Sequence, residues 1–382
     1  MSKRTCPNAD ANSSEAREPS PKRSRPDPSG ESSSNPAAPS TSTDIAEPLS
    51  TVTPQSTSNQ GSTPSAVSMK SYTMRLIQKE VQHKNIVKYL DDFEILDEGM
   101  KHHALRLEVL GPTVEKVFDP SLPKFHPNVL KSVITQVLKA VKYIHGINIV
   151  HMDIKSNNVM IVINEENIRE IANSNNVEST DYRMDLTSAK STITVKLGDF
   201  GIAFNKGKSD HHPQPACTYC APESFLTTTI DFPIDMWSMG CMIYKIVTRH
   251  PLLKCDQKEG HEQKDMPKMA KALGPIPGAL FQNSQRPEYK DYFGVKDCID
   301  CGTPDVHGNF VRAASEYLNH EDALHFSEFT RRCLKYDPKE RLTAAEALDD
   351  KFLVPHEVDL VHGNEIPPHS TEPAVGQPAT SQ

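Results

Sequence analysis

Apolar residues recur every three or four positions in two stretches of the chain, and this spacing predicts two helices that each bury one face. The first helix is expected over residues 69–82 and the second over residues 127–145. Gly146 follows the second stretch and is the residue type at which helices commonly end. The apolar faces consist of Met74, Ile77 and Val81 in the first helix and of Val133, Val137, Val141 and Ile144 in the second.

Short runs of β-branched and apolar residues predict strands. Residues 149–150 and 159–161 enclose a polar loop, which gives the order strand, loop, strand. Residues 193–197 form a further apolar run, and residues 104–110 alternate before ending at Gly111. Residues 164–191 are a polar insertion between two of these strands.

The ends of the chain differ in composition from its middle. The 382-residue sequence begins with sixty-odd residues that are mostly Ser, Thr, Pro, Asn and Ala. Such a segment cannot bury enough apolar surface to offset its ordering entropy, so residues 1–68 and the polar residues 356–382 are predicted to be disordered. The remainder, about three hundred residues, suffices for one large domain with a sizeable core.

Charge and targeting signals limit the choice of partners and compartment. The net charge of −8 favours basic partners such as Arg-rich peptides and argues against direct nucleic-acid binding. No apolar run is long enough to span a bilayer and no signal peptide is found, so an intracellular protein without membrane contact is expected. The basic cluster at residues 22–25 is either a nuclear localisation signal or a solubilising run, which leaves both nucleus and cytoplasm open.

Eight cysteines include two C-x-x-C pairs, Cys217/Cys220 and Cys298/Cys301. Zinc binding is one interpretation of such pairs. However, about eighty residues separate the two pairs, far more than the fifteen to twenty of common zinc sites. Reduced thiols are therefore favoured.

The polar loop carries an acid, a base and an amide at fixed spacing. It reads His151-Met152-Asp153-Ile154-Lys155-Ser156-Asn157-Asn158. Phosphoryl transfer requires a carboxylate to accept the proton of the attacking hydroxyl, a cation beside the transferred group and an oxygen ligand for Mg²⁺. Asp153, Lys155 and Asn158 fit these three roles in that order. The alternative is a solvated loop that merely carries polar residues.

Three further motifs follow in order: Asp199-Phe200-Gly201, Ala221-Pro222-Glu223 and Asp235-Met236-Trp237-Ser238-Met239-Gly240. The first follows an apolar run, where a metal-binding aspartate is expected to leave a strand. Together with the pattern H-x-D-x-K-x-x-N, these residues resemble those of a eukaryotic protein kinase. The resemblance implies an α+β, bilobal fold with a shortened, β-rich small lobe at residues 69–110 and a complete, mostly helical large lobe at residues 111–355.

The same resemblance implies ATP and Mg²⁺ as cofactors, with Asn158 and Asp199 as metal ligands. Leu107, Glu108 and Leu110 would form the hinge. In this arrangement Leu107 faces the back pocket, and backbone groups of Glu108 and Leu110 hydrogen-bond adenine. Arg341 would hold Glu223, and Asp235 would anchor the catalytic loop. The residues with implied structural roles are His151, Phe200, Gly201, Glu223, Asp235 and Arg341.

Residues 74–353 resemble the LAMMER (CDC-like) and SR-protein kinases of the CMGC group. The motifs that carry this resemblance are Leu107-Glu108-Val109-Leu110-Gly111, Leu273-Gly274-Pro275-Ile276-Pro277 and Gly308-Asn309-Phe310-Val311-Arg312. It implies transfer to Ser/Thr of Arg/Ser-rich splicing factors, and a monomer is expected. Met152 replaces an arginine that binds an activation-loop phosphate in many kinases, so a loop that orders without such a phosphate is expected.

The kinase pattern is incomplete before and after the catalytic loop. No glycine-rich loop precedes residue 83, and Lys70, the nearest match to the strand lysine, lies too close to the first helix. Met74 stands where the helix glutamate belongs, and Glu80 is almost two turns too late to replace it. Ala216 stands where Ser/Thr kinases place a threonine, with Thr218 nearby but out of register.

Three hypotheses follow from these matches and departures. The first is an active serine/threonine protein kinase that acts on Arg-rich substrates. The second is a pseudokinase or scaffold that binds basic peptides without efficient phosphoryl transfer, since the loss of one preorganised contact typically costs ~10²–10³ in rate. The third places the missing small-lobe strands in an upstream exon that this sequence lacks.

Overall fold

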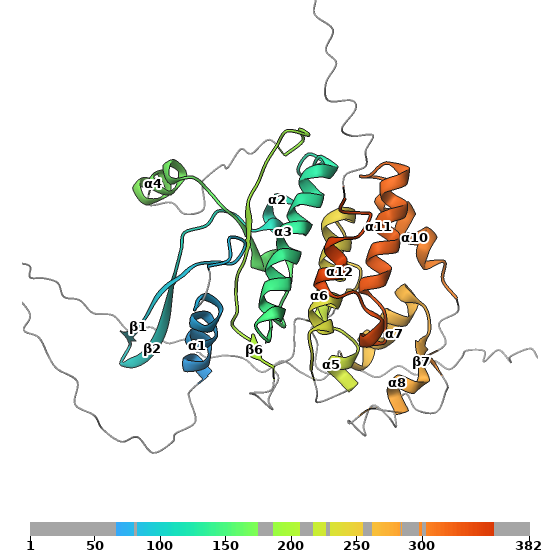
Figure 1. Ribbon diagram of the computed structural model, residues 1–382, viewed down its shortest axis with the longest axis horizontal. Coiled ribbons are helices and arrows are strands. Elements are labelled where there is room, and N and C mark those ends of the chain that lie inside the picture. The colour runs from blue at the N-terminus through green and yellow to red at the C-terminus, as the bar shows by residue number, and fades with distance from the viewer. Residues whose placement is uncertain are drawn as a thin grey trace, which may run out of the picture. The chain divides into compact units, whose positions relative to one another are not determined.

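The computed structural model describes residues 66–79, 82–174, 186–206, 217–226, 230–254, 262–282, 284, 298–299 and 303–354. All of them belong to one compact unit, residues 62–382. Helices and short two-stranded sheets alternate along this unit (Figure 1). The predicted α+β class is therefore confirmed. Within the described ranges, no helix is both long and apolar enough to cross a membrane.

The bounds of the elements are as follows. The helices are α1 (Ala66–Gln78), α2 (Val114–Val117), α3 (Pro127–Gly146), α4 (Glu165–Ser174), α5 (Glu223–Leu226), α6 (Pro233–Thr248), α7 (Glu262–Leu273), α8 (Gly278–Gln282), α10 (Val306–Ala314), α11 (His320–Cys333) and α12 (Ala344–Leu348). The strands are β1 (Tyr89–Asp97), β2 (Met100–Leu107), β3 (Ile149–Val150), β4 (Val159–Ile161), β5 (Val195–Leu197), β6 (Phe204–Asn205), β7 (Ile276–Pro277) and β8 (Cys298–Ile299). Short 3₁₀ helices cover Ser156–Asn158, Cys217–Tyr219 and Pro338–Glu340.

Helix α3 forms where its apolar spacing predicts. The His126 side chain caps it by accepting a hydrogen bond from the N–H of Asn128 (3.2 Å), and Pro127 occupies the first turn, where a missing N–H is tolerated. Its predicted apolar face is fully buried. Gly146, however, is the last helical residue and does not reverse the chain. The left-handed residue beyond the helix is Asn148 (φ 62°).

Helix α1 begins and ends earlier than the periodicity predicts, at Ala66 and Gln78. Met74 and Ile77 are buried as expected, whereas Val81 lies outside the described residues. The Tyr143 hydroxyl of α3 donates a hydrogen bond to the carbonyl of Ile77 (2.8 Å). Carbonyls in the last turn of a helix have no partner within it, so this bond both satisfies the end of α1 and ties it to α3.

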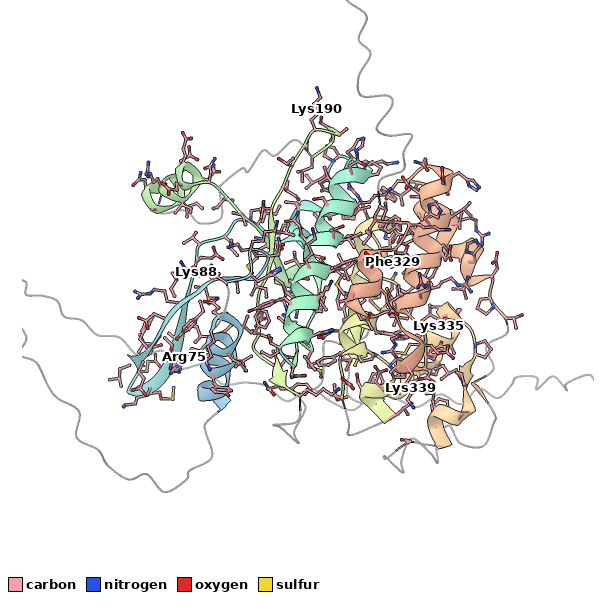
Figure 2. All side chains as sticks on the ribbon, viewed as in Figure 1. Arg75, Lys88, Lys190, Phe329, Lys335 and Lys339 are labelled. Carbon is pink, nitrogen blue, oxygen red and sulfur yellow. The ribbon has the colours of Figure 1, made fainter. Side chains whose placement is uncertain are left out.

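Strands β1 and β2 form an antiparallel hairpin that contacts α1 (Figure 1). Glu98 (φ 47°) and Gly99 (φ 78°) make its two-residue turn, and two successive left-handed residues match the twist of a hairpin. Arg75 of α1, labelled in Figure 2, forms an ion pair with Asp92 of β1. The alternating run at residues 104–110 supplies only the end of β2, because the strand stops at Leu107.

The predicted order of strand, loop and strand is present around residues 151–158. Strand β3 pairs with β6, and β4 pairs with β5, both antiparallel. The strands on either side of the loop are thus each held by a strand on either side of Asp199. The polar insertion at residues 164–191 contains α4, which the sequence did not predict.

Helix α6 runs through the middle of the buried core. Trp237 is fully buried, and Gly240 faces α11, where an added Cβ would lie 2.9 Å from the Cβ of Cys333. Only glycine permits this approach of the two helices. Phe329 of α11 is also fully buried (Figure 2). A reciprocal capping box between Thr343 and Glu346 begins α12, which packs on α3.

Candidate active site

Asp153, Lys155 and Asn158 form one hydrogen-bonded cluster between β3 and β4. The Lys155 Nζ lies 2.6 Å from Asp153 Oδ2, and the Asn158 Nδ2 donates to the Asp153 carbonyl (2.8 Å) and to Oδ2 (2.9 Å). A 3₁₀ turn at Ser156–Asn158 brings these side chains together. The other carboxylate oxygen, Oδ1, makes no hydrogen bond with a described residue. Asp153 therefore has one oxygen held in place and one able to accept a proton.

Asp199 lies at the same end of the β4–β5 ladder as Asn158. The two strands pair up to that end, and the Gly198 N–H donates a hydrogen bond to the Asn158 carbonyl (2.8 Å). Asp199 has a left-handed backbone (φ 55°), which is uncommon for a residue other than glycine. The Gly201 N–H donates a long hydrogen bond to its carboxylate (3.3 Å). The predicted pair of metal ligands thus comes from neighbouring strand ends.

His151 is fully buried beneath the loop and links it to the residues around Asp199. Its Nδ1 accepts a hydrogen bond from the Asp153 N–H (3.2 Å), and its Nε2 lies 3.0 Å from the Gly198 carbonyl. The rings of His151 and Phe200 lie 4.6 Å apart. Burial lowers the pKa of His151, although the carboxylates of Asp235, Asp153 and Asp199 oppose the shift. The imidazole is therefore neutral, with Nδ1 as acceptor and Nε2 as donor.

Asp235 of α6 anchors the backbone of the loop. Its Oδ2 accepts a hydrogen bond from the His151 N–H (2.8 Å), and its Oδ1 accepts one from the Met152 N–H (2.9 Å). The Nε2 of His145 lies 2.9 Å from the same carboxylate. Met152 itself is left-handed (φ 72°) and only 1 % exposed, so its side chain belongs to the core.

Glu223 and Arg341 form the ion pair expected from their motifs. The Arg341 Nη1 donates to Oε1 of Glu223, and Nη2 donates to Oε2 at 2.6 Å. The arginine also donates to the carbonyls of Pro233, Lys335 and Tyr336. Its guanidinium group stacks over the ring of Trp237 at 5.0 Å. The pair thus ties the start of α5 to the core.

The predicted hinge follows β2 directly. The Glu108 N–H donates to the carbonyl of Lys88 (2.9 Å), and its carboxylate pairs with Lys196 of β5 (2.6 Å). The carbonyl of Glu108 and the backbone of Leu110 make no hydrogen bond with a described residue. Leu107 is 36 % exposed, so the described part of the chain does not enclose its side chain as the back-pocket interpretation implies. The hairpin has only two strands, and no third strand within the described residues covers that position.

Sequence reasoning missed a second polar network behind the loop. Glu115 of α2 accepts a hydrogen bond from the Ser156 hydroxyl and one from Lys245 of α6 (2.5 Å). Burial opposes the charge of Lys245, but the hydrogen bond to Glu115 outweighs it and raises the pKa of the ammonium group. Ser156 is two residues before Asn158, so this network holds the loop from the side opposite Asp153. Residues this far apart in the sequence carry no local signal that they meet.

The departures from the kinase pattern are partly visible. Lys70 lies within α1 and not on a strand, and Met74 is 3 % exposed in the position expected of the helix glutamate. Glu80, Ala216 and the side chains of Cys217, Cys298 and Cys301 lie outside the described residues, as do the predicted disordered tails apart from Ala66, Val67 and Ser68, which begin α1.

The loop offers oxygen ligands that suit a hard divalent cation. The Nδ2 of Asn158 is engaged by Asp153, whereas its Oδ1 makes no hydrogen bond with a described residue. No group of three or more His, Cys, Asp or Glu side chains able to hold a metal occurs in the described ranges. Mg²⁺ needs no such cage, because it is commonly bound by one or two carboxylates together with phosphate oxygens. Asn158 and Asp199 therefore fit an ion that arrives with a nucleotide.

Comparison with known proteins gives one matching family and several relatives. The family model described as "Protein kinase domain" matches residues 63–353. Serine/threonine-protein kinase ppk5 of Schizosaccharomyces pombe is 29 % identical over 287 residues, which cover 73 % of this chain and 30 % of that protein. Dual specificity protein kinase CLK2 of Homo sapiens is 27 % identical over 288 residues, with 73 % and 53 % covered. Serine/threonine-protein kinase AFC3 of Arabidopsis thaliana is 27 % identical over 266 residues, with 66 % and 63 % covered.

Proposed function

Because this chain belongs to the protein kinase domain family, we propose that it is a serine/threonine protein kinase that transfers the γ-phosphoryl group of ATP to protein substrates. The observation that carries the proposal is the cluster of Asp153, Lys155 and Asn158 on one loop, with Asp199 at the adjacent strand end. The chain spans between 30 % and 63 % of the length of the three relatives named above, so activity is proposed on the strength of this site.

Each residue of the cluster has one task in this proposal. Asp153 accepts the proton of the substrate hydroxyl on Oδ1, the oxygen without a hydrogen bond. Lys155 holds Oδ2 at 2.6 Å and carries positive charge to where the phosphoryl group passes. Asn158 fixes the orientation of Asp153 and turns its own Oδ1 outward.

The nucleotide would lie between the hinge and the two strand ends. Asn158 and Asp199 would hold Mg²⁺, which when bound neutralises charge on the phosphate oxygens. The carbonyl of Glu108 and the backbone of Leu110 would hydrogen-bond adenine, since both are without hydrogen bonds in the described part of the chain. The Glu108–Lys196 ion pair joins that hinge to β5, the strand that leads into Asp199.

Arg-rich proteins are the proposed substrate class. The net charge of −8 attracts basic segments, and two of the relatives are LAMMER-type kinases by resemblance of their motifs. Arg/Ser-rich splicing factors fit this chemistry. We place the protein in the nucleus, the cytoplasm or both, as a monomer that contacts neither nucleic acid nor membrane directly. The name "dual specificity" of one relative makes tyrosine a residue to test beside serine and threonine.

The direct test is phosphoryl transfer from [γ-³²P]ATP to an Arg/Ser peptide by the full chain. Asp153→Asn is the test variant, and Asp91→Asn, an exposed hairpin residue, is the matched control. Removal of a general base is expected to lower kcat about 10²–10⁴-fold, with the control unchanged. Equal background signal from the unmodified protein and from Asp153→Asn would sink the proposal.

A second candidate function is a binding module without efficient transfer. It is favoured by Met74, which buries an apolar side chain where active kinases place a glutamate, and by Lys70, which lies on α1. Thermal unfolding with increasing Mg²⁺–ATP separates the two candidates, because a ligand that binds only the folded state raises Tm. A clear rise would argue against a module that binds peptides alone, and the transfer assay then decides between the remaining readings.

A further inference from the structure

A groove of about 640 Å³ lies between α3 and the segments that precede β1 and β5. It is separate from the loop at residues 151–158. Its polar lining contains no acidic side chain and includes Lys84, Asn85, Ser132, Thr135, Gln136 and Lys139. Ile193 and Leu353 add an apolar part.

Two lysines of this groove lack a countercharge. Lys84 and Lys139 are exposed and form no ion pair with a described residue. A third lysine, Lys131, is buried and neutralised by Asp322 at 2.6 Å. Burial lowers the pKa of the neighbouring His83, and the charges of Lys84 and Lys139 lower it further. The groove therefore has a positive potential that no carboxylate within the described ranges balances.

Asn85 adds a buried acceptor that lacks a donor. It is 1 % exposed, and its Nδ2 donates to Gln136 Oε1 and to the Val195 carbonyl, both at 2.9 Å. These two bonds fix the amide orientation, and its Oδ1 is buried without a hydrogen-bond partner in the described part of the chain. Buried polar groups are nearly always paired, so this oxygen requires an N–H or O–H donor.

The described chain reaches this groove just before its last described residue, Val354. Phe352 packs under Lys131 of α3 (5.7 Å from the ring centroid), and Leu353 lines the groove. Residues 355–382, 28 in number, follow. They contain four acidic residues and no lysine or arginine. The first two acids alternate with apolar residues in the order Glu357-Val358-Asp359-Leu360-Val361.

We propose that residues 357–361 of the same chain dock in this groove, with Glu357 and Asp359 on Lys84 and Lys139 and a backbone N–H on Asn85 Oδ1. The chemistry matches on three counts: acids meet unpaired lysines, apolar residues meet Ile193 and Leu353, and an extended backbone supplies the missing donor. Four residues of extended chain span about 13 Å, so Glu357 can enter the groove from Leu353. Tethering raises the local concentration of the segment to the millimolar range. This inference does not depend on phosphoryl transfer.

Carbodiimide crosslinking of the full chain tests the proposal, because the reagent joins a carboxylate to an amine only where the two are in contact. Mass spectrometry would identify the crosslinked residues. Crosslinks from Glu357 or Asp359 to Lys84 or Lys139 should exceed those to Lys142 about tenfold. Lys142 is the matched control, an exposed lysine on the same helix that lines a different cavity. The preference should disappear at ~1 M salt, where charges are screened beyond about 3 Å.

Three results would overturn the proposal. An equal yield at Lys142, or no crosslink from the segment at all, would mean that it does not occupy the groove. Crosslinks found only between isotopically light and heavy copies would assign the occupant to a second chain. Poly-glutamate that protects Lys84 and Lys139 from acetylation, while deletion of residues 355–382 does not expose them, would assign the groove to an acidic partner.

A charge-exchange series guards against misfolding of a single variant. Lys84→Glu with Lys139→Glu should lower the crosslink yield from the segment about tenfold. Adding Glu357→Lys and Asp359→Lys to the same protein should restore contact, now from the lysines of the segment to the acids of the groove. Failure of the fourfold variant to regain the crosslink, with thermal unfolding unchanged, would contradict docking driven by charge.

Discussion

The carboxylate of Asp235 holds the N–H of Met152 at 2.9 Å while the backbone of Met152 is left-handed, with φ at 72°. A left-handed conformation is costly for a residue with a branched backbone environment and a Cβ, and it persists where surrounding contacts impose it. Here the contact comes from α6, a helix eighty residues further along the chain. The shape of the catalytic loop is therefore set from the core.

Replacing Asp235 by asparagine should destabilise the fold. The amide can accept from one of the two loop N–H groups but presents its own NH₂ to the other, which leaves a buried donor unpaired. A loss of about 1–3 kcal/mol in the free energy of unfolding is expected from urea titration. Asp91→Asn, which touches only an exposed ion pair with Arg106, should change it by less than about 1 kcal/mol. Similar losses for the two variants would contradict the anchoring role.

Restoring an arginine at Met152 should not create a phosphate receptor. The side chain is 1 % exposed and belongs to the core, so a guanidinium group there would be buried without a partner. Met152→Arg is expected to cost several kcal/mol, whereas Met152→Leu, which conserves volume, should cost less than about 1.5 kcal/mol. Thermal and urea unfolding measure both. An arginine variant as stable as the leucine variant would mean that the side chain can leave the core.

The Glu223–Arg341 pair should show strong energetic coupling. The side chains are 11 % and 0 % exposed, so removing either one leaves a buried charge uncompensated. Glu223→Gln and Arg341→Met are each expected to cost about 3–5 kcal/mol. The double variant should cost less than their sum by about 0.5–3 kcal/mol. Additive single effects in a double-mutant cycle would show that the two residues act separately.

Stability should fall as the pH drops below about 6.5, in part because of His151. Its pKa is lowered in the folded state by burial, while the unfolded chain keeps a value near 6.5. Between these two values the unfolded state binds the extra proton, so acid favours unfolding by up to about 1.4 kcal/mol per pH unit. His151→Asn should remove that part of the slope between pH 6.5 and 5.5. His102→Asn, at an exposed hairpin position, should keep it.

Features encoded by short sequence patterns could be predicted closely. The loop at residues 151–158 and the apolar face of α3 depend on neighbouring residues, and both lie where the spacing places them. The pairing of Glu223 with Arg341 could be anticipated from motif order alone. The end of α3 could not, because Asn148 and not Gly146 takes the left-handed position.

Features that depend on distant contacts were not predictable. Glu108 was expected to act through its backbone, yet its carboxylate pairs with Lys196 of β5. The Glu115 network joins α2, the loop and α6 across more than a hundred residues. The burial of Met152 also follows from tertiary packing, since the sequence shows only that an arginine is absent. Such contacts arise from how elements pack, and no local spacing encodes them.

The glycine at position 240 has a consequence for inherited variation. Even a methyl group there would press on Cys333 and Leu334 of the neighbouring helix segment, and α6 would have to tilt or retreat. Asp235 lies on the same helix little more than one turn away, so that displacement would carry its carboxylate off the loop. A missense change at a residue that meets no ligand would then resemble a mutation of the site itself in every functional screen.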